Sequence, residues 1–151
     1  MDCESPDLKK IQQTCKKYGA FLLIDCAHDF GCMGENGRGM WEAQGLKDKS
    51  NCVLVGTGSK SLSTNVGFVG CDDPDVIEYF KYFSTAYMFT NAINPVQAAT
   101  SLANLRTIKS NGKQLRKQLQ ENYAYLRKEV ESKGFKVYGI PCAILPIYVG
   151  N

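Results

Sequence analysis

The sequence lacks the features that mark several specialised classes of protein. No apolar run approaches the roughly 20 residues that a membrane-spanning helix needs, and there is no internal repeat or low-complexity segment. The seven cysteines form no C-x-x-C pair and follow no apolar signal segment, which predicts a reducing, cytosolic-type compartment. The excess of positive charge is small: the formal net charge of +3 comes from lysines spread along helical segments, which predicts solvated helix faces rather than a nucleic-acid-binding stripe.

What is present is the composition of an ordinary globular domain. The 151 residues are 44% hydrophobic and 22% charged, which is enough to bury one sizeable core. Helical and strand patterns alternate along the chain. Strand patterns occupy residues 21–25, 51–57, 66–71, 135–139 and 143–150, and helical patterns occupy residues 5–19, 73–83, 95–110 and 113–134.

These patterns predict an α/β fold with a mostly parallel sheet flanked by helices. Ser5 is expected to cap the first helix, and the apolar run FLLID predicts a strand covered on both faces. The helix-then-sheet character of the last third predicts a division of the chain. Residues 1–110 would belong to a larger domain, and residues 111–151 would form a connecting helix and the start of a smaller α+β domain. The apolar face of that helix is predicted to consist of Leu115, Leu119, Tyr123, Leu126 and Val130.

Polar side chains follow two of the predicted strands. Asp25 ends the first strand, in the segment LLIDCAHDFG, and His28, the only histidine in the chain, comes three residues later. Thr57 and Lys60 follow the next strand, in the run TGSK. Because ligands bind beyond the carboxyl ends of parallel strands, both clusters are expected at one edge of the sheet, facing one ligand.

Several kinds of site do not match the spacing of these residues. The run GTGSKS lacks the glycine before the lysine of a phosphate loop and the third glycine of a dinucleotide-binding loop. A metal site is not favoured, because neighbouring side chains of an extended segment point to opposite faces and no second cluster of ligands exists; its ligands would have been Asp25, Cys26, His28, Asp29 and Cys32. A nucleophilic pair of Cys26 and His28 stays open, although no oxyanion-hole partner is recognisable.

Each residue alone also has an ordinary structural interpretation. A lone histidine is often a satisfied structural residue, an aspartate after a strand often caps a turn, and a lysine in a polar loop is often only solvated. Their joint spacing changes this balance, because the surrounding segments resemble one family.

The segment DCAHDFGCMGENGRG resembles the D-E-A-H-S-x-G-x-x-G-x-x-G-R-G segment of the α-oxoamine synthases, which are pyridoxal phosphate (PLP) enzymes of fold type I. The segment VLVGTGSKSLSTNVGFVG is similar to the family's T-x-[ST/G]-K-x-x-G-x-x-G-G segment, and YMFTNAINPVQAATSLANL is similar to its Y-x-x-[ST]-x-x-x-P-P-x-x-A segment. The segments MDCESPDLKKIQQ and CAILPIYVGN also resemble family segments, so the resemblance covers nearly the whole chain in order.

The resemblance implies a role for each of four residues. Asp25 would bond the pyridine nitrogen of PLP and keep it protonated, and His28 would bond the 3-oxygen of the ring. Thr57 would bond the phosphate. Lys60 would form the internal Schiff base with the cofactor and later transfer a proton.

The implied activity is the decarboxylative condensation of an amino acid with an acyl-CoA. Among family members the chain most resembles a serine palmitoyltransferase-type subunit of sphingolipid biosynthesis. The alternatives are an aminolevulinate, aminoketobutyrate or amino-oxononanoate synthase, or a non-catalytic partner subunit. A homodimer or heterodimer with the site at the interface is expected, with Thr90 and Asn91 near the phosphate of the partner subunit's cofactor. The expected location is the cytoplasm, or the cytosolic face of an internal membrane through regions outside this chain.

The sequence also departs from the family pattern. Cys26 stands where the family has Glu or Asp, and Asp29 stands where it has a small residue. Ser63, Thr64 and Val66 replace glycines after the lysine, which predicts a different course for this loop. The family's phosphate loop and ring-stacking residue would come before the first residue, and much of its C-terminal domain after the last. The chain is therefore expected to be a fragment that is inactive by itself and binds no stoichiometric cofactor.

Overall fold

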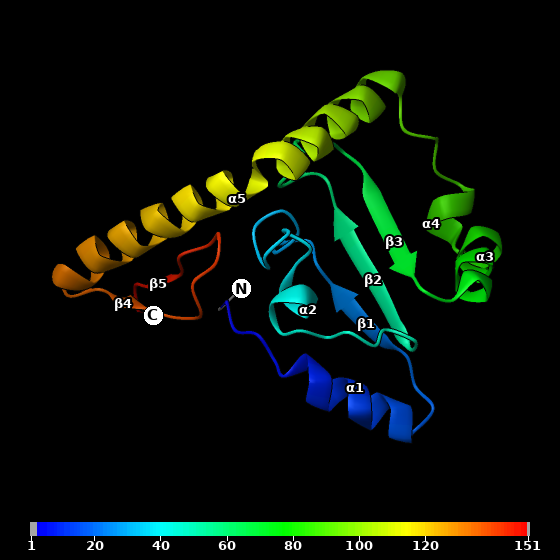
Figure 1. Ribbon diagram of the computed structural model, residues 1–151, viewed down its shortest axis with the longest axis horizontal. Coiled ribbons are helices and arrows are strands. Elements are labelled where there is room, and N and C mark those ends of the chain that lie inside the picture. Colours follow the sequence, from blue (N-terminus) through cyan, green and yellow to red (C-terminus); the bar gives the residue numbers. More distant parts are fainter. Residues whose placement is uncertain (1–2, 151) are drawn as a thin grey trace.

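The computed structural model describes residues 3–150, in which helices and strands are interspersed along the chain (Figure 1). The helices are α1 (Leu8–Lys17), α2 (Met40–Ala43), α3 (Pro74–Phe83), α4 (Thr85–Met88) and α5 (Pro95–Ser132). The strands are β1 (Leu22–Asp25), β2 (Cys52–Thr57), β3 (Gly67–Cys71), β4 (Lys136–Val137) and β5 (Ile147–Tyr148). All five predicted strands are present, and the predicted α/β class is confirmed.

The main sheet has the strand order β1-β2-β3. Strands β1 and β2 pair in parallel, with Asp25 opposite Val55, because the connection between them is long enough to hold α2 and return to the same end of the sheet. Strand β3 pairs antiparallel with β2. Its connection to β2 is the short loop of residues 58–66, which is too short for a crossover. The described part of the sheet is therefore mixed.

The main core lies on the face of the sheet toward α1 and α2. Leu8, Ile24, Cys26, Leu46 and Cys52 form its buried cluster. The other face of β1 is more open, since Leu23 is 59% exposed. The prediction that β1 is covered on both faces is therefore not met by the described chain.

Helix α1 begins two residues later than predicted. Asp7 is its N-cap and accepts a hydrogen bond from the backbone N–H of Lys10, so the prediction that Ser5 caps the helix is wrong. Ser5 instead accepts a hydrogen bond from the Gln44 side chain. Its hydroxyl is thus used to join the N-terminal segment to the residue that follows α2.

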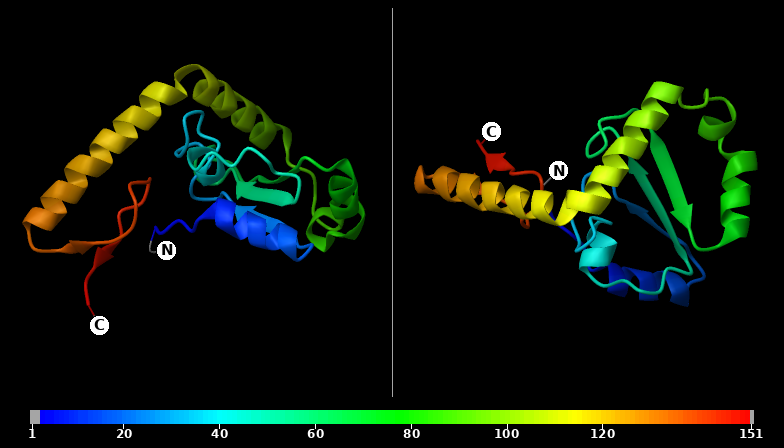
Figure 2. Two further views of the ribbon diagram at one scale, coloured as in Figure 1. Left: turned by 60° about the horizontal axis from the view of Figure 1, so that its bottom comes forward. Right: turned by 45° about the horizontal axis from the view of Figure 1, so that its top comes forward.

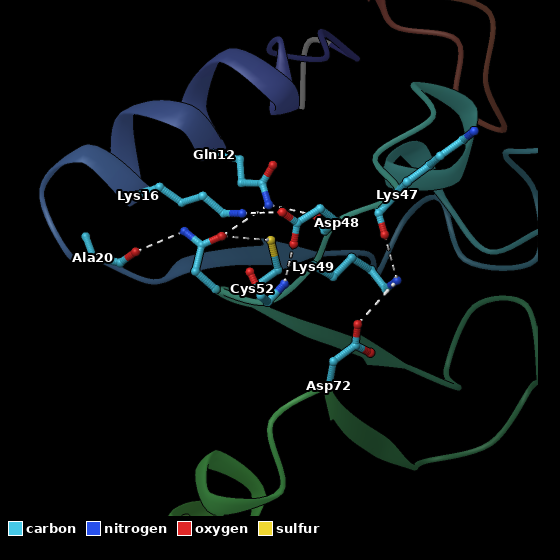
Figure 3. Close-up of polar contacts among 10 residues, drawn as sticks. Gln12, Lys16, Ala20, Lys47, Asp48, Lys49, Cys52 and Asp72 are labelled. Carbon is cyan, nitrogen blue, oxygen red and sulfur yellow. Dashed lines mark hydrogen bonds and ion pairs between the residues drawn. The ribbon is translucent and has the colours of Figure 1, made fainter.

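A polar network fixes α1 to the amino ends of β1 and β2 (Figure 3). The buried Gln12 side chain donates to the backbone carbonyl of Asp48 (2.7 Å) and to the Asn51 side chain (3.1 Å). The Lys16 amine pairs with the Asp48 carboxylate, and the hydrogen bond between them lowers the pKa of Asp48. The network therefore holds the sheet at the end opposite Asp25 and Thr57.

Helix α5 joins the two helices that the sequence predicts around residue 110 into one element of 38 residues. Figure 2 shows that this helix bends in its middle part, which contains Gly112, and helices commonly bend at glycine and serine. The boundary predicted between residues 110 and 111 lies inside α5, and the division into two domains stays a prediction. No helix within residues 3–150 is long and apolar enough to cross a membrane.

The inward face of α5 differs from the predicted one. Tyr123 is buried as expected, but Leu115 and Leu126 are about half exposed. Arg116 is buried instead, and its guanidinium donates to the backbone carbonyl of Glu35. Arg127 donates to the carbonyl of Gly139 (3.3 Å). The face of α5 that contacts the rest of the described chain therefore includes these two arginines and does not coincide with the predicted leucine stripe.

Candidate functional site

The end of β1 and the end of β2 place Asp25 and Thr57 at one edge of the sheet. Asp25 is the last residue of β1 and pairs with Val55, and Thr57 ends β2 two residues later. Residues two apart on a strand share a face, so the Asp25 and Thr57 side chains leave the same face of the sheet. Standard strand spacings put their Cα atoms about 8 Å apart. The strand ends that carry Asp25 and Thr57 thus lie at one edge of the sheet, and their contact with one ligand stays a prediction.

Asp25 and His28 also line a common cavity. The Asp25 carboxylate accepts a hydrogen bond from the backbone N–H of Ala27 (2.8 Å), which holds the turn that follows β1. Asp25 and His28 are both exposed, and both line a cavity of about 540 Å³ beside β1. Residues from both ends of the described chain also line it, namely residues 3–6 and Ile140, Cys142 and Ile144. Thr57 and Lys60 do not line this cavity.

Lys60 lies in the loop of residues 58–66, which follows β2. Its side chain is exposed and forms no ion pair or hydrogen bond with the described residues. The Thr57 hydroxyl, at the start of the loop, lies 3.2 Å from the Val66 carbonyl and accepts the backbone N–H of Ser59 (3.1 Å). Ser63 has a φ of +50°, the left-handed conformation that favours glycine. The loop thus keeps a glycine-like backbone at a residue with a side chain.

Cys26 is unsuited to nucleophilic catalysis. Its side chain is only 2% exposed, and burial, followed by the negative charges of Asp29 and Asp25, raises the pKa of its thiol to about 12. A thiol acts as a nucleophile only when it is ionised. The nucleophilic pair of Cys26 and His28, which the sequence left open, is therefore disfavoured by the structure.

Asp29 anchors the loop that follows the site. One carboxylate oxygen accepts the backbone N–H of Met40 (2.6 Å), while the other oxygen is buried without a hydrogen-bond partner among residues 3–150. Burial raises the pKa of this carboxyl. The described residues contain no group of three or more His, Cys, Asp or Glu side chains that could hold a metal ion.

Thr90 and Asn91 are not brought to the same edge by any contact of the described chain. Both are exposed and lie between α4 and α5. Neither side chain forms a hydrogen bond within residues 3–150. Their predicted contact with a cofactor bound to a second subunit stays a prediction.

Three polar residues of α5 at the site were missed by the sequence analysis. Gln97, Ser101 and Asn104 each form a hydrogen bond with the loop that carries Lys60. Their spacing of four and three residues places them on one helical face. This spacing was visible in the sequence, but nothing there indicated which loop the face would meet.

Comparison with known proteins finds similar proteins along the whole length of this chain. The model of the family described as aminotransferase class I and II matches residues 1–151. An 8-amino-7-oxononanoate synthase from Marinomonas sp. is 33% identical over 152 aligned residues, which cover 100% of this chain and 38% of that protein. A serine palmitoyltransferase from Sphingobacterium spiritivorum is 32% identical and covers 100% of this chain, which spans 37% of its length.

A solved structure has the same fold. A variant serine palmitoyltransferase from S. paucimobilis, with PLP and myriocin bound, superposes with a TM-score of 0.84 at 32% sequence identity. The match covers 95% of this chain and 37% of that one. The chain thus spans less than two fifths of the length of each of these relatives.

Proposed function

The chain belongs to the aminotransferase class I and II family, and from this premise we propose that it forms the cofactor-binding part of a PLP-dependent α-oxoamine synthase. One observation carries the proposal: Asp25 and Thr57 end two neighbouring parallel strands on one face, and Lys60 follows Thr57 by three residues. The relatives named serine palmitoyltransferase and 8-amino-7-oxononanoate synthase, which align along the whole chain, support it.

The side chains fit PLP chemically. The Asp25 carboxylate uses one oxygen for the N–H of Ala27, and no described residue hydrogen-bonds the other oxygen. It can therefore accept a hydrogen bond from a protonated ring nitrogen. The Thr57 hydroxyl would donate to a phosphate oxygen in place of the Val66 carbonyl and the Ser59 hydroxyl, to which it donates here. The Lys60 amine, exposed and outside any ion pair of the described chain, suits an aldehyde.

When bound, PLP supplies a ring that accepts electrons from a substrate carbanion. Asp25 would hold the proton on the ring nitrogen, because a negative charge within hydrogen-bond reach favours the charged form of the ring. His28 would donate to the 3-oxygen, and Thr57 would orient the phosphate. Lys60 would hold the aldehyde carbon of the cofactor and would move a proton at the substrate Cα.

The proposed reaction joins an amino acid and an acyl-CoA and releases an aminoketone, CoA and carbon dioxide. Serine is the amino acid we favour, and the other α-oxoamine synthase activities are the alternatives. We propose that a dimer completes the site, with Thr90 and Asn91 of one subunit near the cofactor phosphate of the other. The proposed location of the protein is the cytoplasm or the cytosolic face of an internal membrane. The competing proposal is a non-catalytic partner subunit. Such a subunit would not need a lysine at position 60.

The decisive experiment uses the complete protein that contains this chain. With PLP added, we expect a visible absorbance band that borohydride bleaches, and peptide mapping should find the reduced cofactor on Lys60. Lys60→Ala should abolish the band, whereas Lys109→Ala, which changes an exposed lysine of α5, should retain it. A reducible band in Lys60→Ala would assign the chemistry to another lysine.

Asp25→Asn tests the electrostatic part of the proposal. The variant should still bind PLP, but loss of the negative charge beside the ring should lower turnover by at least about 100-fold, as removal of one preorganised electrostatic group commonly does. Turnover near that of the parent protein would show that Asp25 only holds the turn at Ala27.

A further inference from the structure

Backbone hydrogen bonds within the loop of residues 58–66, which carries Lys60, hold part of its conformation. The carbonyl of Gly58 accepts the backbone N–H groups of Leu62 and Thr64, both at 3.1 Å, and the Gly58 N–H donates to the Val66 carbonyl (2.8 Å). Leu62 and Thr64 are each only 3% exposed, whereas Lys60 is exposed. The loop therefore exposes its reactive amine while Leu62 and Thr64 are buried beneath it.

Ser63 makes this loop conformation costly. A residue with a side chain is disfavoured at a φ of +50°, and such conformations persist only where surrounding contacts determine them. The conformation of Ser63 therefore depends on the bonds within the loop and on contacts from outside it.

Helix α5 supplies these contacts. The Asn104 amide donates to the Leu62 carbonyl (2.7 Å), and the Ser101 hydroxyl donates to the Thr64 hydroxyl (3.0 Å). The Gln97 side chain accepts the backbone N–H of Asn65 (2.8 Å). Figure 2 shows the first half of α5 alongside the ends of the sheet strands. The three bonds bracket Ser63 on both sides.

We propose that Gln97, Ser101 and Asn104 act as a latch that positions Lys60, with Asn104 as its main residue. Asn104 bonds the buried carbonyl of Leu62, two residues after Lys60, so its loss would leave that carbonyl without a partner among the described residues. The latch residues are positioning residues and do not touch the reacting atoms. The proposal rests on the proposed function only for the role of Lys60; the order of the loop can be measured without it.

The test compares Asn104→Leu with Asn111→Leu, which makes the same chemical change at an exposed residue of the same helix. Hydrogen–deuterium exchange of residues 58–66 in the 151-residue chain should become about tenfold faster in Asn104→Leu, the size expected for one lost hydrogen bond to a buried group, and should not change in Asn111→Leu. Unchanged exchange in Asn104→Leu would overturn the proposal. If that variant unfolds, Asn104→Asp keeps the side-chain size but replaces the donor by a charged acceptor that repels the Leu62 carbonyl, and its loop should exchange faster than in the parent chain. Equal exchange in Asn104→Asp and the parent chain would also overturn it.

A second measurement separates positioning from general stability. In the complete protein with PLP, the pH midpoint of the visible band reports the environment of Lys60; it should shift in Asn104→Leu and not in Asn111→Leu. If both variants show the parent midpoint, Asn104 does not position Lys60. If the parent protein forms no band while the exchange difference is present, the proposed function fails and the latch on the loop stands.

Discussion

Replacing Gly37 by alanine should destabilise the chain far more than the same change at Gly19. Both glycines have a left-handed backbone, with φ of +75° and +64°, so both variants carry the same conformational strain of about 1–2 kcal/mol. They differ in their surroundings. A Cβ added at Gly37 would lie 2.8 Å from a guanidinium nitrogen of Arg116 and 3.0 Å from the carbonyl oxygen of Gly31, whereas a Cβ at Gly19 has nothing within 4 Å.

The extra cost at Gly37 follows from what must move. The backbone oxygen of Gly31 is fixed, because that residue donates its N–H to the Gly37 carbonyl (2.7 Å). The Arg116 guanidinium would therefore shift and weaken its bond to the Glu35 carbonyl. A hydrogen bond to a charged group contributes about 1.5–3 kcal/mol, so we expect Gly37→Ala to be less stable than Gly19→Ala by that amount.

Urea unfolding followed by circular dichroism measures this difference. With an m-value of about 2 kcal/mol/M, the midpoint of Gly37→Ala should lie about 1 M below that of Gly19→Ala. A double-mutant cycle with Arg116→Met then identifies the displaced group: when the guanidinium is absent, Gly37→Ala should cost its backbone strain and the close approach to the Gly31 carbonyl, but no longer the weakened arginine bond. Equal midpoints for the two alanine variants would refute the reasoning, because the close approach of Arg116 to Gly37 would then be without energetic effect.

Two further predictions concern titratable groups. In the folded chain Cys26 and Cys52 should resist a thiol reagent at pH 8 that modifies the other cysteines, because both are at most 2% exposed and burial raises the pKa of each thiol; modification of all seven at one rate, measured by peptide mapping, would contradict this. Burial also raises the pKa of Asp29 above its value in the unfolded chain. The protonated form of Asp29 therefore stabilises the folded chain, fully below about pH 4, and this stability is lost as the pH rises through the pKa of the folded chain. Asn at this position does not titrate, so the stability of Asp29→Asn relative to the parent chain should increase between pH 4 and pH 7, and a constant difference would argue against the raised pKa.

The strands could be predicted from the sequence because each is a short apolar run that ends at a polar or glycine-rich segment. The direction of β3 was missed although its cause was visible: the loop of residues 58–66 is shorter than the dozen residues that a parallel crossover needs. The cap of α1 was missed because Ser5 and Asp7 are both good N-caps, and the choice between them depends on the bond between Ser5 and Gln44, which lies outside the helix.

The inward face of α5 could not be predicted from hydrophobicity. A leucine stripe normally marks the buried side of a helix, but Arg116 and Arg127 each bond a backbone carbonyl from another part of the chain. Such bonds depend on where distant loops lie. The same limit applies to the latch, whose residues are ordinary helix-surface residues until α5 is placed against the loop at residue 58–66.

The Asp25–Thr57 edge was predictable for the opposite reason. Its geometry depends only on two strands that follow one another in the chain and pair in parallel, so a shift of pairing by one residue would turn Asp25 to the other face. The pairing of Leu22 with Cys52 and of Ile24 with Leu54 excludes that shift, because it buries Ile24 and Cys52 in the core and packs Leu22 and Leu54 against them. The core that sets the register thus also sets the face from which Asp25 and Thr57 project. Substitutions in this core are therefore expected to disturb the proposed cofactor contacts even though none of its residues needs to touch the cofactor.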